Sequence, residues 1–157
     1  MKEIERKFLV TSTDYRKHAI ARNFIAQGYL NSDPERTVRI RIKGEIGFIT
    51  IKGKANEAMT TRFEWETEIS LAEAKPMLEM CEPGRIEKMR YEVRCGKHIF
   101  EIDEFEGENS GLIVAEIELS DENEAFQKPE WLGAEVTADA RYYNASLSKN
   151  PYSNWGS

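Results

Sequence analysis

Residues 2–10 read KEIERKFLV, and this stretch decides the fold. In an extended strand successive side chains point to opposite faces, so Glu3, Glu5 and Lys7 lie in a row on one face and the other face is mostly apolar. Two carboxylates beside a lysine are what a site needs to hold a divalent cation and the phosphate that the cation bridges. A single strand of this kind is more commonly an edge strand with a solvated face. The prediction therefore depends on whether later strands repeat the pattern.

Length and composition exclude several classes of protein. The chain has 157 residues, enough for one domain with a sizeable core. Its 22 basic and 28 acidic residues give a net charge of −6, which disfavours a protein that coats nucleic acid. No apolar run is long enough for a membrane span, the N-terminus is not a signal peptide pattern, and the two cysteines lack metal-motif spacing. We expect a cytoplasmic protein with free thiols and no nucleic-acid or membrane partner.

The alternation of charged and apolar residues returns along most of the chain. It predicts strands at residues 27–30, 37–43, 47–53, 62–69, 88–94, 98–105 and 112–119. Helices are expected over residues 13–23 and 139–147, near Ser120, and from the capping box at residues 70–73 towards Met80. Pro76 should kink that helix or end it early. Residues 129–136 read as mostly extended, and residues 151–157 have no periodic signal. We expect one domain over residues 1–150 and a loosely ordered tail.

Two architectures suit strands that have one apolar and one charged face. In an open sheet the charges would face water, whereas in a closed barrel helices would cover the apolar exterior and the charges would line a tunnel. The charges are segregated by sign, in the sets Arg39, Arg41 and Lys43, then Glu64, Glu66 and Glu68, and finally Glu116 and Glu118. Like charges two residues apart are separated by roughly 7 Å and repel by about 2 kcal/mol at an effective dielectric constant of about 20. Enclosed charges of one sign need a counter-charge, and a metal-bound polyphosphate supplies both signs.

The residue types define the chemistry of such a tunnel. Arginine binds phosphate oxygens through forked donors and lysine binds them as a point charge. The basic residues suited to this are Arg39, Arg41, Lys52 and Arg90. Carboxylates that could hold Mg²⁺ or Mn²⁺ are Glu3, Glu5, Glu116 and Glu118, together with Asp103. Phosphoryl transfer needs mostly positioning and charge neutralisation, so the tunnel could be an enzyme without a covalent nucleophile. No P-loop and no nucleophile elbow are present.

Taken in order, the motifs resemble the CYTH superfamily, also called triphosphate tunnel metalloenzymes. They are Glu3-x-Glu5-x-Lys7, Arg39-x-Arg41, Thr50-Ile51-Lys52-Gly53, Arg62-x-Glu64-x-Glu66, Lys88-x-Arg90-Tyr91, Glu101-Ile102-Asp103 and Glu116-Ile117-Glu118. The stretches Pro129-x-Trp131-Leu132-Gly133-x-Glu135-Val136-Thr137 and Arg141-Tyr142-Tyr143-Asn144 are similar to the short bacterial branch of the family. The resemblance implies an α+β fold, a closed eight-stranded antiparallel β-barrel with helices packed outside it and a C-terminal helix near one mouth.

The same resemblance implies Mg²⁺- or Mn²⁺-dependent hydrolysis of a small triphosphate substrate, most often inorganic triphosphate. Its metal set would be Glu3, Glu5, Asp103, Glu116 and Glu118. Its phosphate set would be Lys7, Arg39, Arg41, Lys52, Arg62, Lys88 and Arg90. Tyr29 falls where the short bacterial branch has a suggested proton acceptor, which would act with Lys88, although a lone tyrosine on a short strand is more often a packing residue.

Other functions stay open at this point. The same tunnel could make cyclic AMP from ATP as a class IV adenylyl cyclase does, hydrolyse thiamine triphosphate, or bind polyphosphate or nucleotides without turnover. A solvated sheet with no site is the remaining alternative. Substrate choice depends on the tunnel mouth, which the motifs do not describe. Metal preference, the number of metal ions and the oligomeric state, with a homodimer as one option, are also open.

Overall fold

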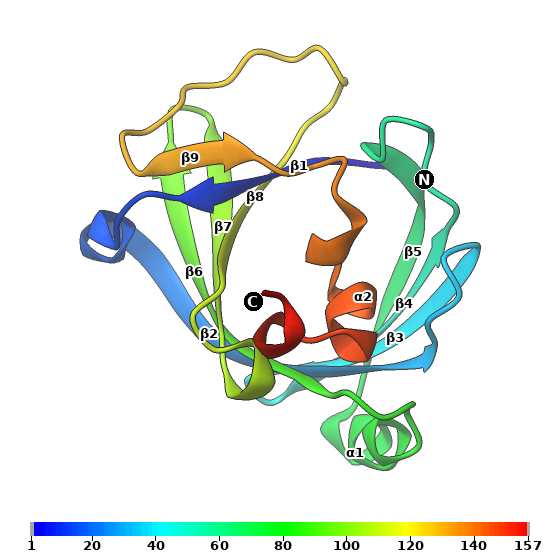
Figure 1. Ribbon diagram of the computed structural model, residues 1–157. Coiled ribbons are helices and arrows are strands. Elements are labelled where there is room, and N and C mark those ends of the chain that lie inside the picture. Colours follow the sequence, from blue (N-terminus) through cyan, green and yellow to red (C-terminus); the bar gives the residue numbers. More distant parts are fainter. Residues whose placement is uncertain (1, 157) are drawn as a thin grey trace.

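Eight antiparallel strands close into a barrel in the computed structural model, which describes residues 2–156 (Figure 1). Around the ring the order is β1, β5, β4, β3, β2, β6, β7, β8, and β5 pairs with β1 to close it. The strands are β1 (Lys2–Val10), β2 (Ala19–Asn31), β3 (Arg36–Lys43), β4 (Ile46–Gly53), β5 (Thr61–Ile69), β6 (Ile86–Cys95), β7 (His98–Phe105) and β8 (Ile113–Glu118). A ninth strand, β9 (Leu132–Glu135), pairs with β1 beyond the stretch that contacts β5. The closed barrel expected from the sequence is confirmed.

Charged side chains face the inside of the barrel because the strand registers align the charged faces. Glu5 lies opposite Glu118 and Lys7 opposite Glu116 in the pairing of β1 with β8. Directly opposed residues share a face of the sheet, so a charged row on one strand meets a charged row on the next. The apolar faces point outwards into two clusters. One gathers Phe8, Tyr91, Phe100 and Trp131 with their neighbours, and the other lies under the long helix.

That helix, α1 (Leu71–Glu79), packs on the outside of β2, β3 and β4. The Ser70 hydroxyl accepts a hydrogen bond from the Glu73 backbone N–H, and the Glu73 carboxylate accepts one from the Ser70 backbone N–H, so the predicted capping box is present. Pro76 does not end the helix at once, since three more helical residues follow it. Gly47 of β4 allows the close approach, because a Cβ there would lie 2.5 Å from the Cβ of Ala74.

Helical structure outside α1 is shorter than the sequence pattern suggested. Of residues 13–23, only η1 (Asp14–His18) is helical, and Ala19 starts the long strand β2, which pairs with β6. No helix begins near Ser120. The stretch expected as one helix over residues 139–147 is divided into η3 (Ala140–Tyr142) and α2 (Asn144–Lys149). A 3₁₀ turn η2 (Gly107–Asn109) follows β7. None of the helices in residues 2–156 is long and apolar enough to cross a membrane.

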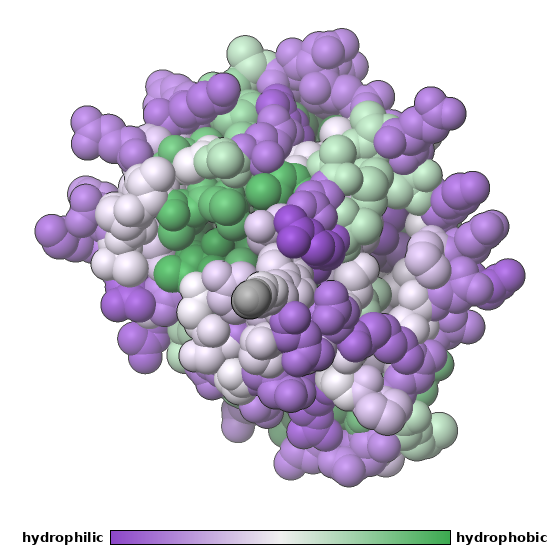
Figure 2. All heavy atoms as spheres, in the orientation of Figure 1, coloured by the Kyte–Doolittle hydropathy of each residue, from purple (hydrophilic) through white to green (hydrophobic). Residues whose placement is uncertain are grey.

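The C-terminal segment, residues 140–156, closes one end of the barrel (Figure 1). At this end the inward residues of the strands are apolar, and Leu147 of α2 packs among Ile86, Phe105 and Val114. Tyr152 of η4 (Tyr152–Asn154) and Trp155 pack against the same cluster. Figure 2 shows hydrophobic side chains gathered at this end of the molecule, beside the C-terminal segment. The charged part of the tunnel therefore has an apolar floor. The division into one domain and a tail stays a prediction.

Candidate functional site

Two cavities run along the inside of the barrel and share six of their lining residues. The first lies against the C-terminal segment and is lined by Glu5, Lys7, Tyr29, Thr37, Arg39, Arg41, Lys52, Arg62, Arg90, Glu116, Tyr143, Asn144 and Ala145. The second is more acidic and is lined by Glu3, Glu5, Arg39, Arg41, Lys52, Glu64, Glu66, Arg90, Glu101, Glu116, Ile117 and Glu118. The sequence segregates charges by strand, and the barrel turns that segregation into a basic region and an acidic region of one tunnel.

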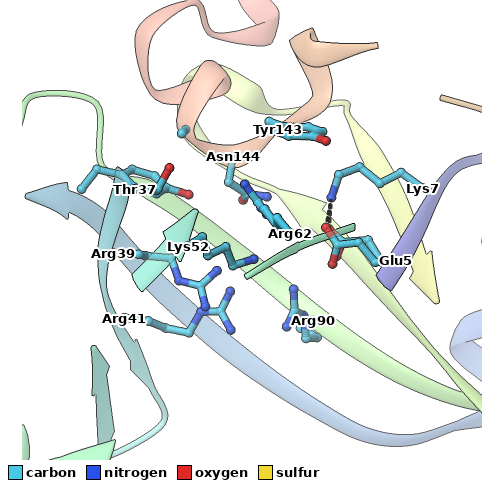
Figure 3. A pocket seen from close by; sticks show the side chains of 13 residues that line it. Glu5, Lys7, Thr37, Arg39, Arg41, Lys52, Arg62, Arg90, Tyr143 and Asn144 are labelled. Carbon is cyan, nitrogen blue, oxygen red and sulfur yellow. Dashed lines mark hydrogen bonds and ion pairs between the residues drawn. The ribbon is translucent and has the colours of Figure 1, made fainter. Parts of the chain in front are cut away.

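Three arginines converge in the basic region (Figure 3). Arg39 donates from Nη2 to the Thr50 hydroxyl at 3.1 Å, but its buried Nε has no hydrogen-bond partner among residues 2–156. Arg41 donates from Nε to the neutral Gln27 Oε1 at 2.9 Å. Burial, together with the positive charges of Arg39 and Arg90, lowers the pKa of Arg41 to about 9. A buried polar group without a partner and a buried cation without a counter-ion both cost free energy unless a ligand satisfies them.

Arg90, Lys88 and Asp103 form a fully buried cluster beside these arginines. Asp103 accepts hydrogen bonds from Arg90 Nε at 2.7 Å and Arg90 Nη2 at 2.8 Å, and its Oδ2 lies 2.8 Å from Lys88 Nζ. Burial raises the pKa of Asp103, but the charges of Arg90 and Lys88 outweigh it and lower that pKa to about 2. Burial, only partly offset by Asp103, lowers the pKa of Lys88 to about 7. Asp103 thus fixes two of the predicted phosphate-binding cations in place.

The remaining predicted metal residues lie together in the second cavity. Glu3 accepts hydrogen bonds from Lys52 Nζ at 3.0 Å and Arg62 Nε at 3.3 Å. Lys7 Nζ lies 2.9 Å from Glu5 Oε1 and 3.1 Å from Glu116 Oε1. The charges of Glu3, Glu5 and Lys7 are thus paired with side chains of opposite charge inside the barrel. Asp103 does not line either cavity.

The carboxylates offer the oxygen ligands that a divalent cation binds, but their side chains are not grouped around one metal position. Among residues 2–156, no three His, Cys, Asp or Glu side chains are grouped as they stand to hold a metal ion. Glu118 lies opposite Glu5 in the β1–β8 register, and burial with the charges of Glu3 and Glu101 raises its pKa. Clustered carboxylates that repel one another are relieved by a cation, and oxygen ligands are those that Mg²⁺ and Mn²⁺ prefer.

Tyr29 lies inside the tunnel, as expected, but it is not bonded to Lys88. Its hydroxyl accepts a hydrogen bond from Gln27 Nε2 at 3.3 Å, and burial raises its pKa. Lys88 Nζ instead donates to Asn144 Oδ1 at 2.9 Å. The predicted proton-transfer pair is therefore linked through two amides rather than in direct contact.

Sequence reasoning did not assign four of the residues that build the site. They are Gln27, Thr50, Tyr143 and Asn144. The Tyr143 ring lies 5.2 Å from both Lys7 Nζ and the Arg62 guanidinium, and its hydroxyl donates to the Met59 carbonyl at 2.9 Å. A signal was available for Thr50, Tyr143 and Asn144, because each belongs to one of the family motifs. No pattern marked Gln27.

Comparison with known proteins gives consistent matches over nearly the whole chain. A family model described as the CYTH domain matches residues 1–152. An inorganic triphosphatase of Acetivibrio thermocellus is 46% identical over 156 residues, which are 98% of this chain and 97% of the relative. An inorganic triphosphatase of Nitrosomonas europaea is 37% identical over 153 residues, which are 94% and 97% of the two chains. The crystal structure of the inorganic triphosphatase NE1496 superimposes with a TM-score of 0.65 at 36% identity, covering 93% of this chain and 97% of that one.

Proposed function

The chain belongs to the CYTH domain family, and from this premise we propose that it is a triphosphatase that hydrolyses inorganic triphosphate inside the tunnel. Two relatives that match along almost their entire length carry the name inorganic triphosphatase. The observation that carries the proposal is the charge of the first cavity, where six basic side chains meet two carboxylates in a protein of net charge −6. Such a cavity selects a compact polyanion with negative charge on every phosphate group.

The basic side chains would hold the phosphates. Arg39 and Arg41 of β3 and Arg90 of β6 point towards one another, so their donors can reach adjacent phosphate groups (Figure 3). Lys7, Lys52 and Arg62 line the same cavity and add to its positive charge. The Nε of Arg39, which has no partner among residues 2–156, and the terminal nitrogens of Arg41 are donors that phosphate oxygens would accept from.

The acidic side chains would hold Mg²⁺ or Mn²⁺. Glu3, Glu5, Glu116 and Glu118 line the second cavity directly beside the basic region, and we place the ion with them. Asp103 belongs to the predicted metal set, but with both oxygens bonded to cations it is better suited to orient Arg90 and Lys88. A bound divalent ion would supply charge neutralisation at the phosphate oxygens.

Hydrolysis then needs a water molecule and a group that takes its proton. The water oxygen forms a bond to the terminal phosphorus, the bond from that phosphorus to the bridging oxygen breaks, and pyrophosphate leaves. Lys88 is the candidate acceptor for that proton, because burial lowers the pKa of its amine; it lines neither cavity, and its amine is bonded to Asp103 and Asn144, so the proton would reach it through Asn144. Tyr29, whose pKa burial raises, stays neutral and is suited to donate a hydrogen bond to a substrate oxygen.

The test is a phosphate-release panel with inorganic triphosphate, thiamine triphosphate and ATP, each with Mg²⁺, Mn²⁺ and Ca²⁺. The proposal expects release from inorganic triphosphate with Mg²⁺ or Mn²⁺ and none in the presence of EDTA. Formation of cyclic AMP and pyrophosphate from ATP would refute the proposal and show that the protein is a cyclase. Tight binding of triphosphate without turnover with any metal would refute the proposal and show that the protein is a non-catalytic sensor.

One feature of the tunnel favours a second substrate class. An apolar recess borders Arg62 and Tyr143 at the end closed by the C-terminal segment, and its other walls include Pro34, Met59 and Ala140. The recess has room for an organic group attached to a triphosphate. Turnover of ATP or thiamine triphosphate faster than that of inorganic triphosphate in the same panel would show that the recess selects the substrate.

A further inference from the structure

Gln27 lies behind the lining of the first cavity, in contact with three residues that form it, and carries no charge. It is fully buried, and it faces Arg41 across the β2–β3 register with Tyr29 two residues further along the same face of β2. Arg41 Nε donates to its Oε1 at 2.9 Å. Its Nε2 lies 3.3 Å from the Tyr29 hydroxyl and 3.3 Å from Asn144 Oδ1. One amide therefore contacts a phosphate-binding arginine, the buried tyrosine and the C-terminal segment.

We propose that Gln27 is a positioning residue of the triphosphate site, which fixes the direction of the Arg41 guanidinium without neutralising it and ties Tyr29 to Asn144. This inference rests on the proposed function. Because the amide binds only Nε of Arg41, its two terminal nitrogens stay available to phosphate oxygens. Asn144 Oδ1 also accepts from Lys88 Nζ, so the same amide pair fixes the distance between Tyr29 and Lys88.

The choice of an amide over an acid follows from the charge of the cavity. A glutamate at position 27 has the same shape, but its carboxylate would form an ion pair with Arg41 and cancel one of the charges that attract the substrate. Asp103 forms ion pairs of this kind with Arg90 and Lys88. Gln27 supplies the orientation that an acid would give and leaves the positive charge of Arg41 in place.

The experiment measures kcat and KM for inorganic triphosphate, together with the calorimetric Kd of triphosphate, in wild type, Gln27→Glu and Gln27→Met. Loss of a hydrogen bond to a charged group predicts a kcat/KM about tenfold lower for Gln27→Met. Gln27→Glu should raise KM and Kd further than Gln27→Met does, because it also removes the net charge of Arg41. Gln127→Glu is the matched control, since it changes the exposed glutamine outside the tunnel in the same way and should leave both constants unchanged.

A purely structural role for Gln27 gives a different result. It would lower the melting temperature of both variants and leave KM and Kd of the folded protein at wild-type values, which would overturn the inference. A second readout is the double variant Gln27→Met with Arg41→Met. Because Gln27 acts through Arg41, adding Gln27→Met to Arg41→Met should raise Kd by less than twofold, and a full additional tenfold increase would contradict the account.

Failure of the proposed function is recognised separately. A wild-type protein that releases no phosphate from triphosphate refutes the triphosphatase, whereas the Kd measurements still test Gln27. Equal Kd values in wild type, Gln27→Met and Gln27→Glu overturn the inference whether or not the wild type is active.

Discussion

Replacing Arg41 with methionine should stabilise the empty protein and weaken its binding of triphosphate. Arg41 is held by a neutral amide, and burial with its two arginine neighbours lowers its pKa from 12.5 to about 9. At 1.36 kcal/mol per pKa unit, this lowering corresponds to roughly 5 kcal/mol of unfavourable charging. Because Arg41 is only half-buried, we discount that figure by about half for solvent screening, and the Gln27 oxygen that loses its donor costs about 1 kcal/mol.

The net gain is therefore about 1–2 kcal/mol of unfolding free energy, or a melting temperature about 5 °C higher for a chain of this size. Binding changes in the opposite direction. Wild type with triphosphate at about 100 times Kd gains about 2.7 kcal/mol. A Kd raised at least tenfold by loss of a charged hydrogen bond reduces that gain to about 1.4 kcal/mol or less.

Thermal unfolding with and without triphosphate measures both effects in one titration. Arg94→Met is the control, because Arg94 is an exposed arginine at the end of β6. It should change neither the melting temperature nor the shift caused by triphosphate. A lower melting temperature for empty Arg41→Met, combined with an unchanged triphosphate shift, would refute the reasoning that the tunnel holds an uncompensated charge.

Three further predictions test the parts of the fold that support the site. Leu147→Ala should lower the unfolding free energy by about 2–5 kcal/mol in denaturant titrations, because Leu147 is 1% exposed in the apolar floor of the tunnel. A change below about 1 kcal/mol would mean that the C-terminal segment is not packed there. Gly47→Ala should cost about 1–3 kcal/mol, since the new Cβ would meet Ala74 of α1. Burial and the hydrogen bond to Glu104 raise the pKa of Tyr15. The contribution of Tyr15 to the unfolding free energy is therefore complete below pH 10 and is lost as the pH rises through the raised value. The unfolding free energy should decline less steeply with alkaline pH in Tyr15→Phe than in wild type, and equal slopes would count against this assignment.

The barrel could be predicted because its charged faces repeat with a period of two and are segregated by sign. Glu5 and Lys7 on β1 meet Glu118 and Glu116 on β8, and Glu3 meets Arg62 on β5, in the register that the alternation requires. Local periodicity fails where tertiary pairing decides the structure. Ile20 and Phe24 have the spacing of a helix face, yet both lie exposed on the outside of β2, which pairs with β6 instead.

The residues missed in the site share a physical reason. Gln27 and Thr50 are uncharged, so they interrupt no charge pattern, and their roles arise only from the side chains that the barrel brings to them. Asn144 reaches the tunnel because the C-terminal segment folds into the end of the barrel, which no strand pattern indicates. The roles of the predicted metal and phosphate sets, the oligomeric state and the cytoplasmic location stay predictions.

Substitution of Glu5 tests the proposed triphosphatase site most directly, because Glu5 lines both cavities and contacts Lys7. The decisive measurement is phosphate release from inorganic triphosphate during a Mg²⁺ titration, for wild type and for Glu5→Ala. We expect wild-type activity that rises from zero in EDTA to a plateau with Mg²⁺, and no release by a Glu5→Ala protein that remains folded. Full activity in Glu5→Ala, or wild-type activity independent of metal, would contradict the assignment of the tunnel as a metal-dependent triphosphatase site.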